Sequence, residues 1–439
     1  MSSRRPIYVN PATGERCEWS PVPGLAEFHR SLPNYAPTPL MSLNELATEL
    51  GIRAIYVKDE SNRFGLPAFK ALGASWGCFR AIARQVGLPT TASLDDVSIQ
   101  AKTNSLVLFA ATEGNHGRAV AFMARLMGIE ARIFVPRSMD ETTQGFITGE
   151  GARVFVSQGS YDMAVQEAFD QSRHIENAFL IQDTAFEGYE DIPAWIVEGY
   201  STMMIEVEEQ LSQLGLSASV VVTPVGVGSL AHAVTQHCKS RERPVSVVAV
   251  EPDSAPSLFS SLRAGKLIPV QTSDTIMDGM NCGTVSSTAW PDLQRLVDAC
   301  VTVSSYESHL AVQYLTSRAV DTGPCGGASL AALRCLAADK ERSTVLNEDS
   351  IVVLLATEGA RKYQTPRDVS IEDAVDLTQV LTRINSSNPT LSVSDGAGES
   401  EIADYLSAWF AHRDIEYHRI EPFAGRPSIV GGAPRKRRR

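Results

Sequence analysis

The sequence has no paired cysteines, no long uninterrupted apolar run and no excess of positive charge. Its 7 cysteines are dispersed without a Cys-x-x-Cys pair, which is typical of free thiols in a reducing compartment. The longest apolar run, residues 220–234, is interrupted by Pro224 and two glycines, and is too broken to span a bilayer. No apolar segment of the secretory type follows the first residues. We therefore expect a cytoplasmic protein without a membrane partner.

The charge balance argues against a general nucleic-acid binder. The chain carries 51 acidic residues against 39 Lys and Arg, a formal net charge of −12, whereas phosphate backbones are bound by clustered Lys and Arg. The basic tail at 434–439 is the exception. It could be a localisation signal or a nucleic-acid patch, and a solvated chain end is the interpretation we favour. We expect no nucleic-acid partner and no metal.

Strand-like runs alternate with helical patterns along most of the chain. This alternation predicts an α/β protein with largely parallel sheets, and the apolar strands indicate that helices cover both sheet faces. A chain of 439 residues has room for two or more domains, and it contains no internal repeat. We expect strands at 54–57, 105–110, 131–135, 153–156, 219–222, 246–250 and 351–355, and helices at 117–127, 161–173, 196–214 and 230–241.

The pattern changes after Tyr363. Residues 370–384 form an expected amphipathic helix with Ser370 as its N-cap, and a loop at 385–398 follows. A second helix is expected at 400–412, with short strands at 415–420 and 428–431. This stretch is too short to build much core alone, so we expect a small α/β appendix at the C-terminus.

A glycine-rich turn at Val225–Ser229 separates an expected strand from an expected helix. Such a junction directs several backbone N–H groups and a helix N-terminus at one anion, and two glycines permit close approach. It could equally be a tight structural turn, or open a nucleotide-binding unit, although no Gly-x-Gly-x-x-Gly follows. Taken alone, the signal is weak.

A second junction, Thr112–Gly117, follows the expected strand 105–110. Its backbone N–H groups and the Thr112 hydroxyl suit a carboxylate. Asn115 could contact the phenolate oxygen of a cofactor, or it could cap the helix. For His116 we favour a packed or surface histidine, because no residue at metal-ligand spacing accompanies it.

Lys70 follows Phe69 and precedes a small-residue helix start at 71–77. A lysine among apolar residues is desolvated, which lowers its pKa and prepares it as a nucleophile and base. For any single lysine, a side chain that reaches solvent is the alternative. The order of a lysine, a Gly-Asn turn and a glycine-rich turn favours the catalytic interpretation, because these three parts hold a pyridoxal phosphate.

These features resemble the fold-type II pyridoxal-phosphate enzymes of the tryptophan-synthase β superfamily, and more closely the diaminopropionate ammonia-lyases. The resemblance implies two open, twisted, mostly parallel sheets flanked by helices. It also implies a lyase core at 1–375, with a small subdomain at about 90–205 inserted in the large one. The segments that carry it are 35–40, 57–61, 63–66, 68–70, 114–118, 182–189, 225–230, 275–277, 281–283 and 356–359.

The resemblance implies a role for each site residue. Lys70 is the Schiff-base lysine, Asn115 contacts the ring hydroxyl, and Thr357 faces the pyridine nitrogen. Asp183 lies near the substrate amine, and Glu113 stands where the family has an aspartate proposed as the second base for the D-isomer. The phosphate is held by Gly226, Val227, Gly228, Ser229 and Leu230, and the substrate carboxylate by Thr112, Gly114 and His116.

Three departures from the family pattern bear on the amino-acid substrate rather than on the cofactor. The extra methylene of Glu113 moves its carboxylate by about an ångström. The family's Gly-Glu-Ser-Gly turn is Gly-Pro-Cys-Gly at 323–326. After Gly359 the chain continues with Ala360 and Arg361 instead of an acidic or polar pair.

The expected activity is therefore a pyridoxal-phosphate-dependent α,β-elimination of 2,3-diaminopropionate, or of a related β-substituted amino acid, to pyruvate and ammonia. A serine/threonine dehydratase or a β-replacement synthase on the same scaffold is the alternative, and a non-catalytic partner of a deacetylase is an alternative of another class. Segments 384–389, 398–406 and 425–431 resemble the start of acetylornithine deacetylases of the M20 peptidase family, so residues 376–439 are expected to be a truncated appendix of that type. We expect a homodimer.

Overall fold

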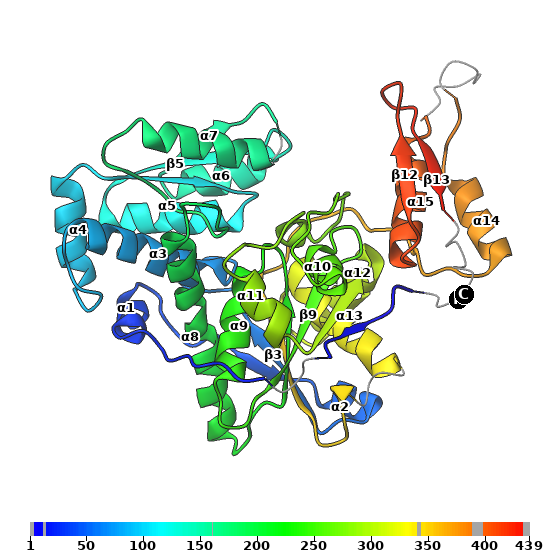
Figure 1. Ribbon diagram of the computed structural model, residues 1–439, viewed down its shortest axis with the longest axis horizontal. Coiled ribbons are helices and arrows are strands. Elements are labelled where there is room, and N and C mark those ends of the chain that lie inside the picture. Colours follow the sequence, from blue (N-terminus) through cyan, green and yellow to red (C-terminus); the bar gives the residue numbers. More distant parts are fainter. Residues whose placement is uncertain (1–3, 12–14, 160, 340–343, 389–397, 433–439) are drawn as a thin grey trace.

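The computed structural model describes residues 4–11, 15–159, 161–339, 344–388 and 398–432. It has a large sheet, a small sheet and, near the C-terminus, a two-stranded sheet, each accompanied by helices (Figure 1). We call residues 374–432 the appendix; in Figure 1 it stands at the upper right in orange and red. The predicted α/β class with two mostly parallel sheets and a small C-terminal unit is confirmed.

The large sheet has 7 strands in the order β1-β10-β9-β8-β11-β3-β2. The strands from β10 to β3 are parallel, while β1 and β2 are antiparallel and form the two edges. The strands are β1 Tyr8–Val9, β2 Leu40–Ser42, β3 Ala54–Asp59, β8 Val220–Pro224, β9 Ser246–Pro252, β10 Ala299–Val303 and β11 Ile351–Ala356.

Alternate side chains of the central strands enter two separate cores. In β8, Val221 belongs to one core, while Val220 and Val222 belong to the other. Because both faces are covered, the strand has no polar alternation. The first core is closed by α3 Lys70–Gln85, α8 Asp191–Gln213 and α9 Ser229–Lys239, and the second by α2 Asn44–Leu50, α12 Ser305–Ser317 and α13 Pro324–Ala338.

The small sheet has 4 parallel strands in the order β6-β5-β4-β7 and lies in the chain between α3 and α8. Its elements are α4 Leu94–Thr103, β4 Val107–Ala111, α5 Asn115–Met127, β5 Glu130–Val135, α6 Glu141–Gly149, β6 Arg153–Val156, α7 Tyr161–Arg173 and β7 Ala178–Leu180. The other helices of the two sheets are α1 Leu25–Ser31, α10 Ser257–Ala264, the 3-10 helix η1 Asp278–Met280 and α11 Trp290–Leu296.

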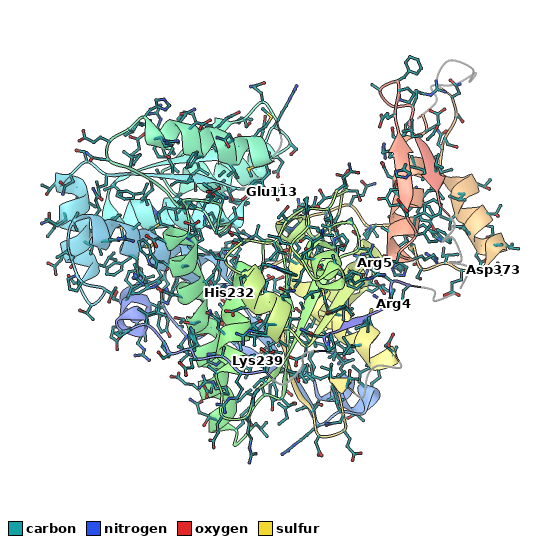
Figure 2. The ribbon with its side chains drawn as sticks, viewed as in Figure 1. Arg4, Arg5, Glu113, His232, Lys239 and Asp373 are labelled. Atoms are coloured by element: carbon teal, nitrogen blue, oxygen red, sulfur yellow. The ribbon has the colours of Figure 1, made fainter. Side chains whose placement is uncertain are left out.

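The appendix consists of α14 Ala374–Arg383, α15 Ser400–His412, and the antiparallel strands β12 Tyr417–Ile420 and β13 Ser428–Gly431. A buried contact joins it to the large sheet's domain: His412 Nδ1 lies 2.7 Å from Asp253 Oδ2. Arg5 donates to the carbonyl of Ala411 at 2.9 Å. Figure 2 places Arg4 and Arg5 where the appendix meets the larger body.

The seven expected strands end within two residues of observed ones, whereas β1, β2, β7 and β10 were missed. Helix α8 begins five residues earlier than expected, at Asp191, because Pro193 fits a first turn that needs no N–H donor. The helix expected from Ser370 was wrong at its start. It begins at Ala374, with Asp373 as the N-cap accepting from Val375 N at 2.9 Å, while Ser370 bonds to Asp368 instead.

Part of the expected loop at 385–398 and the basic tail at 434–439 lie outside the described residues. Within the described ranges, no helix is both long enough and apolar enough to cross a membrane.

Candidate active site

Four chain segments converge where the parallel strands end. β3 leads to Lys70, β8 to the glycine turn and β11 to Thr357, while β4 of the small sheet leads to Thr112–Gly117. Ligands of open α/β sheets bind at this carboxyl edge. Two contacts join the parts: Lys70 meets Asp183, which follows β7, and Asn115 Nδ2 donates to Glu358 Oε2 at 3.4 Å. The structure thus brings the predicted segments together.

Lys70 is the first residue of α3, and a buried ion network fixes the loop before it. The fully buried Arg63 pairs with Glu60 and with Glu206 of α8, each at 2.7 Å. Lys58 also pairs with Glu206 at 2.7 Å. Two acidic and two basic groups balance one another, and a fully paired buried network holds one geometry in a low dielectric. The position of Lys70 is therefore set by a rigid loop.

The Lys70 ammonium contacts the carboxylate of the buried Asp183. Burial is the largest influence on the pKa of Lys70 and lowers it, but the charge and hydrogen bond of Asp183 help to raise the pKa above its ordinary value. Burial likewise opposes ionisation of Asp183, yet Lys70 leads the groups that bring its pKa down to about 2. The prediction of a lowered lysine pKa was wrong here, because apolar neighbours in sequence concealed an acidic neighbour in space. Both groups are charged at neutral pH.

The glycine turn between β8 and α9 has free donors. Within the described residues, the backbone N–H groups of 226–230 have no hydrogen-bond acceptor, and the first helix bond runs from His232 N to Gly228 O at 2.8 Å. Gly228 has φ +90°, a conformation that favours glycine. A Cβ on Gly226 would lie 2.7 Å from the carbonyl oxygen of Gly279. Unpaired donors at a helix N-terminus, with no room for side chains, fit a phosphate group.

The Thr112–Gly117 turn is arranged around one hydroxyl. Thr112 Oγ1 accepts from Gly114 N at 2.9 Å and from Gly117 N at 3.0 Å, which leaves its own proton to donate. Gly114 has φ +143°, which a side chain would oppose. His116 is buried and its Nε2 donates to Ile181 O at 2.8 Å, so the packed-histidine interpretation is confirmed. The backbone N–H of His116 has no acceptor within the described chain.

Asn115 is held by a carboxylate to which the sequence assigned no role. Glu358 Oε1 accepts from Cys325 N at 3.1 Å, and its Oε2 accepts from Asn115. Arg361, one of the departures from the family pattern, pairs with Asp278 at 2.7 Å and with Glu358 at 3.6 Å. The buried Thr357 precedes Glu358, and its carbonyl accepts from the N–H of Phe69, the residue before Lys70, at 3.2 Å. The carboxyl end of β11 therefore carries one carboxylate and one neutral hydroxyl.

Glu113 faces the same site from the small sheet's domain, and Figure 2 shows it on the side nearest the large sheet's domain. Burial, then the charges of Glu113 and Asp183, raises the pKa of the Cys282 thiol to about 12. Lys70 acts on this thiol in the opposite direction. Cys282 therefore lies close enough to Glu113, Asp183 and Lys70 for the charge of each to act on its thiol.

Cys282, Glu358 and Ser286 are site residues that sequence reasoning left without a role. The first two lie inside segments that carry the family resemblance, which was a usable signal. Ser286 lies in a loop outside every motif, and only the fold brings it to the glycine turn: Ser286 N donates to Val227 O at 2.8 Å.

Comparison with known proteins agrees with this geometry. A family model described as pyridoxal-phosphate dependent enzyme matches residues 32–358. The diaminopropionate ammonia-lyase of Escherichia coli (strain K12) is 30% identical over 360 residues, 78% of this chain and 89% of that protein. The enzyme of the same name from Salmonella typhimurium is 36% identical over 274 residues, 60% of this chain and 68% of that protein.

Among solved structures, the E. coli diaminopropionate ammonia-lyase in complex with an aminoacrylate-PLP azomethine reaction intermediate superimposes with a TM-score of 0.73. The two chains are 28% identical in sequence, and the match covers 81% of this chain and 93% of that one.

Proposed function

The chain belongs to the pyridoxal-phosphate-dependent enzymes, and we propose that it is an ammonia-lyase which eliminates ammonia from 2,3-diaminopropionate. The observation that carries the proposal is the contact of Lys70 with an ionised, buried Asp183 beside a glycine turn with free donors. A buried carboxylate favours a substrate that brings a second cation, because an unpaired buried charge is costly. The β-ammonium of 2,3-diaminopropionate is such a cation.

The residues present fit pyridoxal 5′-phosphate. The N–H groups of 226–230 would hold its phosphate, Lys70 would bond its aldehyde carbon, and Asn115 would meet its ring hydroxyl. Thr357 would face the ring nitrogen with a neutral hydroxyl. The ring would then withdraw electrons less strongly than a ring whose nitrogen pairs with a carboxylate, which suits elimination over transamination. When bound, the cofactor supplies an electron-accepting ring that takes up the charge left after removal of the α-proton.

Lys70 is the proton carrier of the proposed reaction, and Asp183 controls it. Without cofactor, the carboxylate of Asp183 contacts Lys70 and helps to raise its pKa. Once bonded to the cofactor's aldehyde carbon, Lys70 would no longer be this ammonium, and a substrate α-amine that takes its place there would release it as a neutral amine, able to accept the α-proton. A substrate β-ammonium paired with Asp183 would keep this carboxylate from the freed lysine, so that burial, which lowers the lysine pKa, would act with less opposition. Because the β-ammonium already carries its proton, it would leave as neutral ammonia, and neither Lys70 nor Asp183 has to protonate it.

Glu113 would be the base for a D-substrate. L- and D-isomers present their α-protons on opposite faces, so one lysine cannot serve both. The longer side chain of Glu113 must fold back to occupy the position of an aspartate, at a cost in geometry and rotamer entropy. We therefore propose a stronger preference for the L-isomer than in family members with aspartate at this position.

Product stoichiometry tests the proposed function. The purified protein is incubated with L-2,3-diaminopropionate, L-serine and L-threonine, and the keto acid and ammonia are quantified. Elimination from 2,3-diaminopropionate, followed by hydrolysis, yields two molecules of ammonia per pyruvate, whereas serine yields one. We expect the diamino acid to be preferred with the two-to-one ratio. Preference for serine or threonine would replace the proposal with a dehydratase.

We further propose a cytoplasmic homodimer whose appendix is a remnant of an M20-like unit. The free cysteines of the described chain support a reducing compartment. The similarity of segments 384–389, 398–406 and 425–431 to deacetylases supports the origin of the appendix. Light scattering of the purified chain tests the dimer, and a monomeric mass would contradict it.

A further inference from the structure

Ser286 lies between two parts of the proposed active site. It belongs to the loop between η1 and α11 and is 3% exposed. Its backbone N–H donates to the carbonyl of Val227, in the glycine turn, at 2.8 Å. Its Oγ accepts from the backbone N–H of Ala185 at 3.0 Å. One residue thus bonds the proposed phosphate turn with its main chain and the loop that carries Asp183 with its side chain.

The loop on the other side of this contact returns from the small sheet. Ile181 N extends that sheet by donating to Phe109 O at 2.7 Å, and Asp183 follows two residues later. Besides the contact of Asp183 with Lys70, Ala185 is therefore a second point at which this loop meets the large sheet's domain. The neighbouring Ser287 adds a longer contact, from its Oγ to Ala185 O at 3.5 Å.

Ser286 itself is firmly placed. Its carbonyl accepts from Ala289 N and Trp290 N, each at 3.1 Å, at the start of α11. The same helix supplies Leu293, whose Cδ1 would lie 3.0 Å from a Cβ on Gly228. A serine side chain has only one torsion, χ1, that moves its Oγ. A shift of the glycine turn that moves Ser286 therefore also moves the hydrogen bond to Ala185.

We propose that Ser286 is a positioning residue that couples seating of the cofactor phosphate in the glycine turn to placement of Asp183 beside Lys70. The inference rests on the proposed function, because it deepens the role of Asp183. An anion bound at 226–230 fixes the position of Val227, Val227 fixes Ser286, and the Oγ of Ser286 fixes Ala185. Asp183 is then held where it meets either the lysine or the substrate β-ammonium.

Ser286→Ala removes the side-chain bond to Ala185, together with the 3.2 Å contact to Thr288 Oγ1, and keeps the backbone bond to Val227. We expect pyridoxal phosphate to bind within about twofold of wild type, while kcat on 2,3-diaminopropionate falls roughly three- to tenfold, the range for one lost hydrogen bond. Ser286→Thr keeps the hydroxyl and should restore kcat. Ser287→Ala, which removes only the long contact, is the matched control and should change kcat less than Ser286→Ala.

Amide hydrogen exchange, measured on the full chain with and without pyridoxal phosphate, reports the coupling without using turnover. In wild type and in Ser287→Ala, loading should slow exchange of residues 182–186 together with 226–231. In Ser286→Ala, only 226–231 should respond. Equal protection of 182–186 in Ser286→Ala and wild type would overturn the proposal, as would a parallel loss of cofactor affinity and kcat. Because exchange needs only cofactor binding, this result stays interpretable even if 2,3-diaminopropionate proves not to be the substrate.

Discussion

Replacement of Gly228 by alanine tests the proposed phosphate cradle. Gly228 has φ +90°, and an added Cβ would lie 3.0 Å from Leu293 Cδ1 and 3.1 Å from Val285 Cγ1. The left-handed conformation costs a non-glycine residue about 1–2 kcal/mol, and the two contacts require side chains to move by a few tenths of an ångström. The turn relieves this strain by moving, which misaligns N–H groups aimed at the phosphate. Loss of one hydrogen bond to a charged group costs about 1.5–3 kcal/mol, or roughly 10- to 150-fold in affinity.

Gly215→Ala is the matched control. Gly215 also has a positive φ, +69°, but a Cβ there meets nothing within 4 Å, and the residue lies just after α8, away from the glycine turn. Without cofactor, Gly215→Ala should lose about 1–2 kcal/mol of unfolding free energy, and Gly228→Ala at least as much, because only Gly228→Ala adds close contacts. Only Gly228→Ala should raise the cofactor dissociation constant, measured by fluorescence titration, by at least about tenfold. Gly228→Asp, which adds a negative charge, should raise it further. Equal dissociation constants for Gly228→Ala and Gly215→Ala would refute the placement of the phosphate.

Three other substitutions or deletions have defined expectations. Glu113→Asp should raise kcat/KM on D-2,3-diaminopropionate by on the order of tenfold and leave the L-isomer nearly unchanged; equal effects on both isomers would assign Glu113 a structural role. Asp183→Asn should lower kcat/KM on L-2,3-diaminopropionate by on the order of a hundredfold and on L-serine much less, because only the former brings a β-cation; equal losses would contradict the pairing. Since the pKa of Asp183 is depressed to about 2, its contribution to stability is complete above about pH 4 and is lost as pH falls through about 2, which acid titration of wild type and Asp183→Asn can resolve. Deletion of residues 376–439 should leave cofactor binding intact but reduce the unfolding free energy by about 1.5–3 kcal/mol, because the hydrogen bond between Asp253 and His412 is lost; loss of cofactor would make the appendix part of the core.

The central strands and the two turns proposed to bind cofactor and substrate were predictable because each has a local signal. Apolar β-branched runs such as 351–356 predict strands that are covered on both faces. The glycine turn was recognisable because the positive φ of Gly228 is a conformation that favours glycine. The edge strands β1 and β2 were not predictable, because they have only 2 and 3 residues. The strand β10, Ala299–Val303, is buried throughout but follows a short helix without a strong turn signal.

Charges at the site depend on contacts between residues far apart in sequence. Lys70 lies among apolar residues in the chain, and only the fold brings Asp183 to it from 113 positions away. The buried partners of Arg63 include Glu206, which is 143 positions away. Ser286 has no motif at all. Local sequence therefore predicted which segments converge, but not the protonation of their side chains or the bonds that position them.

The central claim is that Lys70 carries the cofactor and moves the proton in an elimination from a diamino acid. The most direct measurement compares wild type, Lys70→Ala and the exposed-lysine control Lys266→Ala in one experiment. It records the visible absorbance of the loaded protein and the pyruvate and ammonia released from L-2,3-diaminopropionate. We predict that wild type and Lys266→Ala share the same absorbance band and turnover, and that Lys70→Ala loses both. Full turnover in Lys70→Ala would contradict the account.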